Sequence, residues 1–134
     1  MKTHNNQLLN PIHRERRLWR NKLELIEQDN DFLLNLLVTL QIEHVITARH
    51  DAKTAIFFNY FQHVSDVVKH LNGLLQIIDK EAKLKIEPDN ASSDDRNPYL
   101  SICKEEINYL EKEYQTLKFN FEAFVKNLSR HNNN

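Results

Sequence analysis

The sequence predicts an all-α protein: an elongated, antiparallel, up-down-up bundle of three helices with coiled-coil-like heptad packing. Between Leu100 and Leu128, nine apolar or aromatic residues recur in alternating steps of three and four. This is the pattern of a helix that packs at a shallow angle along another helix. The 134-residue chain also has one glycine and three prolines, which is too few for the tight turns of an all-β fold. The nine residues are Leu100, Cys103, Ile107, Leu110, Tyr114, Leu117, Phe121, Phe124 and Leu128.

The first helix is predicted from Pro11 to about Thr47, after a polar tail at residues 1–10. Asn10 followed by Pro11 is a typical helix start, because asparagine caps the first turn and proline fits its first position. The segment 29–31, Asp-Asn-Asp, is a place where we expect the helix to bend or admit water. The line expected to be buried is Trp19, Leu23, Ile26, Asn30, Leu33, Leu37, Leu40 and His44.

The second helix is predicted from Ala52 to about Lys85, with Asp51 as its N-cap and a connection at residues 48–50. Neither glycine nor proline marks this connection, so one continuous helix through Asp51 is the alternative. The apolar lines before and after residues 47–53 are out of phase, which favours a turn. The line expected to be buried is Phe57, Phe61, Val64, Val68, Leu71, Leu75, Ile78 and Ala82.

The third helix is predicted from Pro98 to about Arg130, between an acidic loop at residues 87–96 and a polar tail at residues 131–134. Asn97 and Pro98 repeat the helix start of Asn10 and Pro11. A chain of this length forms one domain with one core, here residues 11–130. The short first connection makes its two helices antiparallel neighbours.

The spacing of the seven histidines does not match that of a known metal site. Carboxylate-bridged di-iron bundles need Glu-x-x-His pairs and zincins need His-Glu-x-x-His, and neither pattern occurs. A bundle that binds metal through His44, His63 and His70 is therefore the least favoured hypothesis. We expect no enzyme, no catalytic residue, no cofactor and no small-molecule substrate. Cys103 lies on an apolar helix line, where a buried, inert thiol is expected.

The start of the first helix carries a run of cations around Trp19. Such a run suits nucleic acid or an anionic membrane surface, which is the alternative function. The acidic loop at residues 87–96 lies at the same end of an up-down-up bundle, so the run is expected instead to be neutralised within the molecule. The formal net charge is −1. The basic residues are Arg14, Arg16, Arg17, Arg20 and Lys22.

The first helix also carries a second apolar line at seven-residue steps: Leu18, Leu25, Phe32 and Ile46, with Thr39 filling one step. The helix either twists enough to bury both lines or leaves this one as surplus, and surplus apolar surface usually meets a partner. The leading hypothesis is a non-enzymatic interaction or scaffold protein. It self-associates, most simply as a dimer, or docks a protein partner through its apolar helix faces.

The basic start with Trp19, the leucine-rich helix that follows, and Phe61-Gln62-His63 with Asp66 and His70 resemble small all-helical, coiled-coil-bundle proteins of bacteria. The resemblance implies a helical bundle, and it implies no activity and no functional residue. A cytoplasmic location is expected because residues 1–10 lack an apolar signal core, no apolar run approaches about 18 residues, and one cysteine cannot form an internal disulfide.

Overall fold

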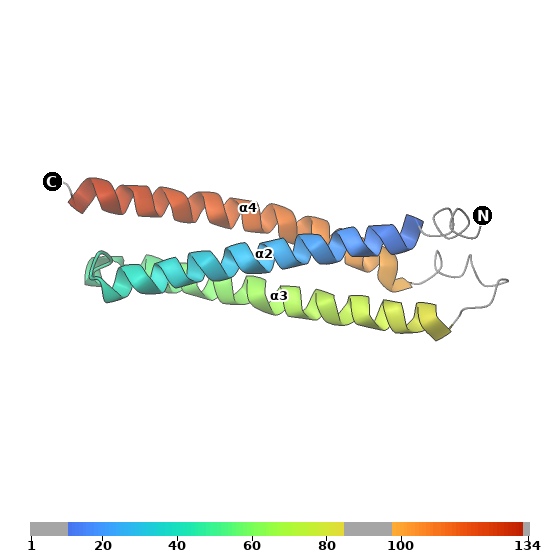
Figure 1. Cartoon of the computed structure of the whole chain (residues 1–134). Coiled ribbons are helices and arrows are strands. Elements are labelled where there is room, and N and C mark those ends of the chain that lie inside the picture. The colour runs from blue at the N-terminus through green and yellow to red at the C-terminus, as the bar shows by residue number, and fades with distance from the viewer. Residues whose placement is uncertain (1–10, 85–97, 133–134) are drawn as a thin grey trace.

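The computed structural model describes residues 11–84 and 98–132, and three long helices pack side by side along its length (Figure 1). Helix α2 spans Pro11–Ile42, α3 spans Asp51–Leu84 and α4 spans Pro98–Asn132. A short 3-10 helix, η1, spans Ala48–His50 between α2 and α3. Helices α2 and α4 run in the same direction and α3 runs against them. The predicted three-helix bundle is thereby confirmed, while the acidic loop at residues 87–96 lies outside the described residues.

The core is built from the apolar lines that the sequence shows. On α4, eight of the nine residues of the line are buried and Leu100 is half-buried. Burial of such a line, worth roughly 1.5–3 kcal/mol for each large side chain, stabilises helices that would not persist alone in water. Phe57, Phe61, Phe121 and Phe124 stack or meet edge to face, with ring centroids 5.1–5.3 Å apart in the three closest pairs. These four rings fill the core in the half of the bundle nearer the α2–α3 connection.

Helix α2 ends at Ile42, so the prediction that it continues to Thr47 was wrong. The Val45 amide donates to the Leu40 carbonyl over 3.0 Å, and the His44 amide donates to the Gln41 carbonyl over 3.1 Å. This is a Schellman motif, the arrangement that commonly caps a helix C-terminus. His44 occupies its left-handed position with φ of 60°, where glycine or asparagine is usual. No glycine marks this end of the helix, and His44 is exposed rather than buried on the core line.

The second half of the connection, where α3 begins, also differs from the prediction. Thr47 is extended, with φ −109° and ψ 176°, and it precedes the helical turn of η1. Asp51 already has helical dihedrals, so it is not the N-cap. The chain therefore turns at residues 43–47, and the alternative of one continuous helix through Asp51 is wrong. The turn folds Ile46 into the core, where its side chain is 6% exposed.

The Asp-Asn-Asp segment at residues 29–31 lies within the continuous helix α2. The Nδ2 of Asn30 donates to the carbonyl of Phe61 over 2.9 Å, and Asn30 is buried. Asp29 accepts a hydrogen bond from the Tyr114 hydroxyl. The polar residues that were expected to weaken the helix instead link α2 to α3 and to α4. None of the described helices is long and apolar enough to cross a lipid bilayer.

Candidate functional site

Helix α2 exposes an apolar line on the side away from the core. Leu18 is 56% exposed, and Leu25 and Phe32 are each 65% exposed. The residues between and beyond them, in steps of three and four, are also exposed, and none of them is charged. In a chain with 28% charged residues, a solvent-facing helix line would ordinarily carry several charges. We name this surface the α2 seam; its residues are Leu18, Asn21, Leu25, Gln28, Phe32, Asn35, Thr39 and Ile42.

Ile46, the fourth residue expected on the exposed apolar line, does not belong to it. It follows the end of α2 and is buried in the core, so the expectation that it is available to a partner was wrong. The reason is the early end of α2, because a seven-residue step keeps its direction only within one helix. Ile42, which is 70% exposed, occupies the corresponding end of the seam. The sequence prediction did not include Ile42, because it followed the apolar line only in seven-residue steps and Ile42 lies three residues after Thr39.

One border of the α2 seam is tied to α4 by a ladder of ion pairs. Glu15 lies 3.8 Å from Lys104, Lys22 lies 3.7 Å from Glu111, and Asp29 lies 3.0 Å from Lys118. Both helices advance by seven residues from one rung to the next, and the sign alternates. The next step of the same spacing holds Leu36 and Val125, which both pack against the core.

The alternating signs fix the register of α2 against α4. A slip by one heptad would place Glu15 opposite Glu111 and Lys22 opposite Lys118, so like charges would meet at successive rungs. Each exposed pair contributes only about 0–1 kcal/mol to stability. The ladder contributes mainly to specificity, because charges that border a coiled-coil seam select one register over its neighbours.

The Asp29 rung continues into the core through Tyr114, which is 2% exposed. Burial and the hydrogen bond to Asp29 raise the pKa of Tyr114 well above its usual value. Partial burial favours a raised pKa for Asp29, but the hydrogen bonds from Tyr114 and Lys118 outweigh it, so the pKa of Asp29 is lowered. Each partner thus stabilises the protonation state in which the other binds it.

The basic run at the start of α2 is partly neutralised within the molecule. Arg16 is buried, with its Nε 3.1 Å from Asp79 of α3, and Arg20 also pairs with Asp79. Lys22 pairs with α4 through the ladder. Arg14 and Arg17 are exposed. The described partners are residues of α3 and α4, and the acidic loop that was expected to neutralise the run lies outside the described residues.

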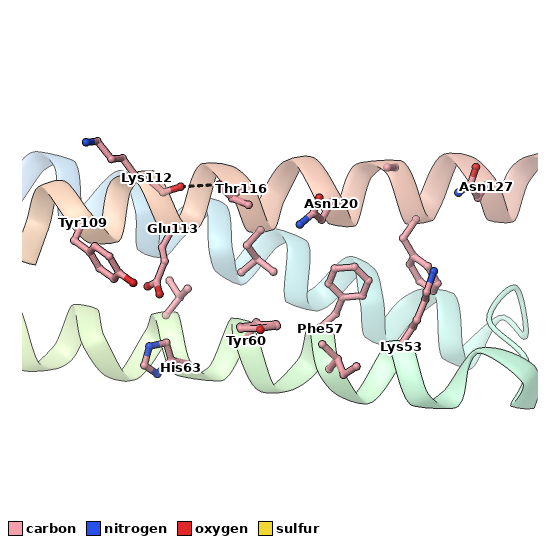
Figure 2. A pocket seen from close by; sticks show the side chains of 15 residues that line it. Lys53, Phe57, Tyr60, His63, Tyr109, Lys112, Glu113, Thr116, Asn120 and Asn127 are labelled. Carbon is pink, nitrogen blue, oxygen red and sulfur yellow. Dashed lines mark hydrogen bonds between the residues drawn. The ribbon is translucent and has the colours of Figure 1, made fainter.

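A groove of about 730 Å³ runs between α3 and α4 (Figure 2). Its apolar walls include Ile56 and Tyr60 of α3, which are 52% and 56% exposed, and Tyr109 of α4, which is 65% exposed. Figure 2 shows Tyr109 and Glu113 extending from α4 toward α3, whereas Lys112 points away from it. Sequence reasoning did not find this groove, because it depends on how far apart two helices lie.

A neighbouring hollow between the same helices brings His63 and His70 near Glu105 and Glu106. Among the residues that the structure describes, no three histidine, cysteine or carboxylate side chains are grouped as metal ligands would be. His44 lies in the α2–α3 connection, so the structure does not bring it together with His63 and His70. Cys103 is buried as expected, and this burial raises the pKa of its thiol.

No family model matches this chain, and neither a curated protein nor a solved structure does.

Proposed function

We propose that this protein is a non-enzymatic interaction protein that self-associates, or docks a protein partner, through the apolar faces of its helices. The α2 seam is the observation that supports the proposal: eight successive seam positions are exposed and uncharged. Coiled-coil partners bind through such lines, since knobs from one helix fill holes on the other. The proposal includes no catalytic residue, no cofactor and no small-molecule substrate.

The apolar side chains of the seam are large enough to contribute to an interface. Full burial of Leu18, Leu25 or Phe32 would contribute about 1.5–3 kcal/mol of binding free energy per side chain. The part of each side chain that is already buried reduces this gain. A symmetric dimer buries each of them twice. Association costs about 4–15 kcal/mol in lost freedom, so the gain is comparable with the cost and predicts a moderate affinity.

The groove between α3 and α4 is a second candidate surface for the same function. Grooves of this kind receive the apolar face of an amphipathic helix. Its exposed Ile56, Tyr60 and Tyr109 offer apolar contacts, and Glu105, Glu106 and Glu113 along the two hollows favour cations on the incoming helix. We rank it below the α2 seam because its walls carry charges at several positions.

Binding of nucleic acid or an anionic membrane through Arg14, Arg16, Arg17, Arg20 and Lys22 is the alternative function. Three of these five side chains already have carboxylate partners on α3 or α4, which lowers the positive charge that a phosphate surface would meet. Salt separates the two functions, because contacts to phosphate weaken steeply with salt and apolar association does not. A cytoplasmic location remains part of the proposal; it rests on the sequence, whose single cysteine suits a reducing compartment.

The experiment that tests the proposal compares the parent chain with the variant carrying Leu25→Glu and Phe32→Glu. At micromolar concentration, light scattering should report at least twice the 16.0 kDa mass of one chain for the parent. The variant should be a folded monomer, because both side chains are 65% exposed and outside the core. A parent that is monomeric and binds duplex DNA or anionic vesicles in low salt would favour the alternative function and overturn this one.

A further inference from the structure

We propose that the α2 seam binds the α2 seam of a second copy of this chain in an antiparallel orientation, about a two-fold axis near Leu25. This inference rests on the proposed function and names its partner and its geometry. The charged residues that border the seam support it.

The apolar residues fit either orientation equally well. In a parallel pair, Leu18, Leu25 and Phe32 would each meet the same residue of the second copy. In an antiparallel pair centred on Leu25, Leu25 meets Leu25, and Leu18 meets Phe32 on both sides of the axis. Each arrangement stacks three apolar layers, so the apolar line does not decide between them.

The two borders of the seam differ in their charges. One border carries Arg17, Glu24 and Asp31, which are exposed and seven residues apart. The other carries Lys22 and Asp29, which belong to the ion-pair ladder with α4. In a parallel coiled coil, the first border of one helix meets the second border of the other about five residues farther along. Arg17 would then meet Lys22 and Glu24 would meet Asp29, each twice and each with like charge.

In the antiparallel orientation, each border of the seam faces the same border of the second copy. Arg17 of each copy then lies near Asp31 of the other, which gives two pairs of opposite charge. Glu24 meets Glu24 once, at the axis. On the other border, Lys22 of each copy lies opposite residue 28 of the other, next to Asp29, which gives two further pairs of opposite charge. Four attractive pairs and one repulsive pair replace four repulsive pairs, and like charges facing each other across an interface select against the wrong arrangement. The charge pattern therefore favours the antiparallel dimer.

A two-fold axis through the seam also closes the assembly at two copies. The same surface is used on both chains, so no second seam is left to bind a third chain. The alternative in which α2 enters the α3–α4 groove of another copy pairs two different surfaces, and such a contact closes only when its rotation forms a ring. The dimer leaves that groove open to a different partner.

Engineered cysteines test the orientation directly. Residues 18 and 32 lie about 21 Å apart along the helix axis, whereas a disulfide needs Cα atoms about 4.4–6.8 Å apart. We expect Leu25→Cys to cross-link with itself under mild oxidation. Leu18→Cys and Phe32→Cys should each fail to cross-link alone and should cross-link with each other when the two variants are mixed. The parent is the control, since its only cysteine, Cys103, is buried.

The outcomes separate the inference from the function on which it rests. Cross-linking of Leu18→Cys with itself, in a chain that is dimeric by light scattering, would show a parallel dimer and overturn the inference while the function stands. A dimer in which none of the three variants cross-links would place the interface elsewhere and overturn the inference too. A monomeric parent would overturn both.

Reversing charges gives an independent readout that requires no oxidation. Arg17→Glu should weaken the antiparallel dimer by roughly threefold to tenfold, because two attractive pairs become repulsive. Arg17→Glu combined with Asp31→Arg should restore the affinity, since opposite charges face each other again. In a parallel dimer, Arg17→Glu would instead strengthen association by relieving the repulsion from Lys22, and that result contradicts the proposal.

Discussion

The hydroxyl of Tyr114 donates a hydrogen bond to the carboxylate of Asp29, joining α4 to α2 across 85 residues of sequence. The adjacent residue, Asn30, donates to the carbonyl of Phe61 and so joins α2 to α3. Two neighbouring residues of α2 therefore link all three helices near the middle of the bundle. Buried polar contacts of this kind add less to stability than to the choice of one helix register, since a shifted register leaves them unpaired.

Tyr114→Phe should lower the free energy of unfolding by about 1–2 kcal/mol. The change removes one hydrogen bond to a charged group, and the partial exposure of Asp29 reduces the loss relative to a fully buried pair. Urea denaturation followed by circular dichroism measures the difference. Tyr109→Phe is the matched control, because Tyr109 is 65% exposed and should change stability little. Equal effects of the two substitutions would show that the Asp29 contact contributes nothing.

The same contact predicts how stability depends on pH. The pKa of Asp29 is lowered below its usual value of 3.8 in the folded protein, so its contribution to stability is present above about pH 4 and is lost as the pH falls through the folded pKa. The pKa of Tyr114 is raised above its usual value of 10.0, so its contribution to stability is present below about pH 10 and is lost as the pH rises toward the folded pKa. Chemical denaturation at several pH values should show the alkaline loss weakened in Tyr114→Phe. An unchanged alkaline slope would contradict this assignment.

The ion-pair ladder predicts coupling between Lys22 and Glu111. Lys22→Glu places two carboxylates together and should destabilise the protein by up to about 1 kcal/mol. Adding Glu111→Lys should recover most of that loss, because opposite charges again face each other. A double-mutant cycle from thermal or urea unfolding gives the coupling, for which we expect about 0.2–1 kcal/mol. Additive effects would indicate that this rung is not formed in solution.

The Schellman motif at the end of α2 predicts an unusual response at His44. His44→Gly should stabilise the protein by up to about 1 kcal/mol, because a left-handed conformation costs a residue with a side chain roughly that much more than glycine. His44→Val should destabilise it, since a β-branched side chain fits that conformation worst. Thermal unfolding of both variants measures the difference. A destabilising glycine would mean that α2 does not end at Ile42 in solution.

The helices could be predicted from the sequence because their information is local and periodic. The apolar line of α4 is visible without reference to the rest of the chain, and it is buried almost throughout. The end of α2 could not be predicted in the same way, because His44 replaces the glycine that normally marks a Schellman motif. The apolar line also continues past the end of the helix into Ile46, which obscures the boundary.

Contacts between distant parts of the chain were less predictable for a physical reason. The partners of Asp29 and Asn30 depend on the register between helices, which residue spacing within one helix does not reveal. The ion-pair ladder could have been found, since charges of alternating sign recur every seven residues on both α2 and α4. The groove between α3 and α4 could not, because its width depends on packing across the whole bundle.

The most direct test of the central claim is the solution mass of three chains at the same micromolar concentration, measured by light scattering. The parent and the groove variant, Ile56→Glu with Tyr60→Glu, should both have twice the 16.0 kDa mass of one chain. The seam variant, Leu25→Glu with Phe32→Glu, should have the mass of one chain and unchanged helix content. A seam variant that remains a dimer, or a parent that is a monomer, would contradict self-association through α2.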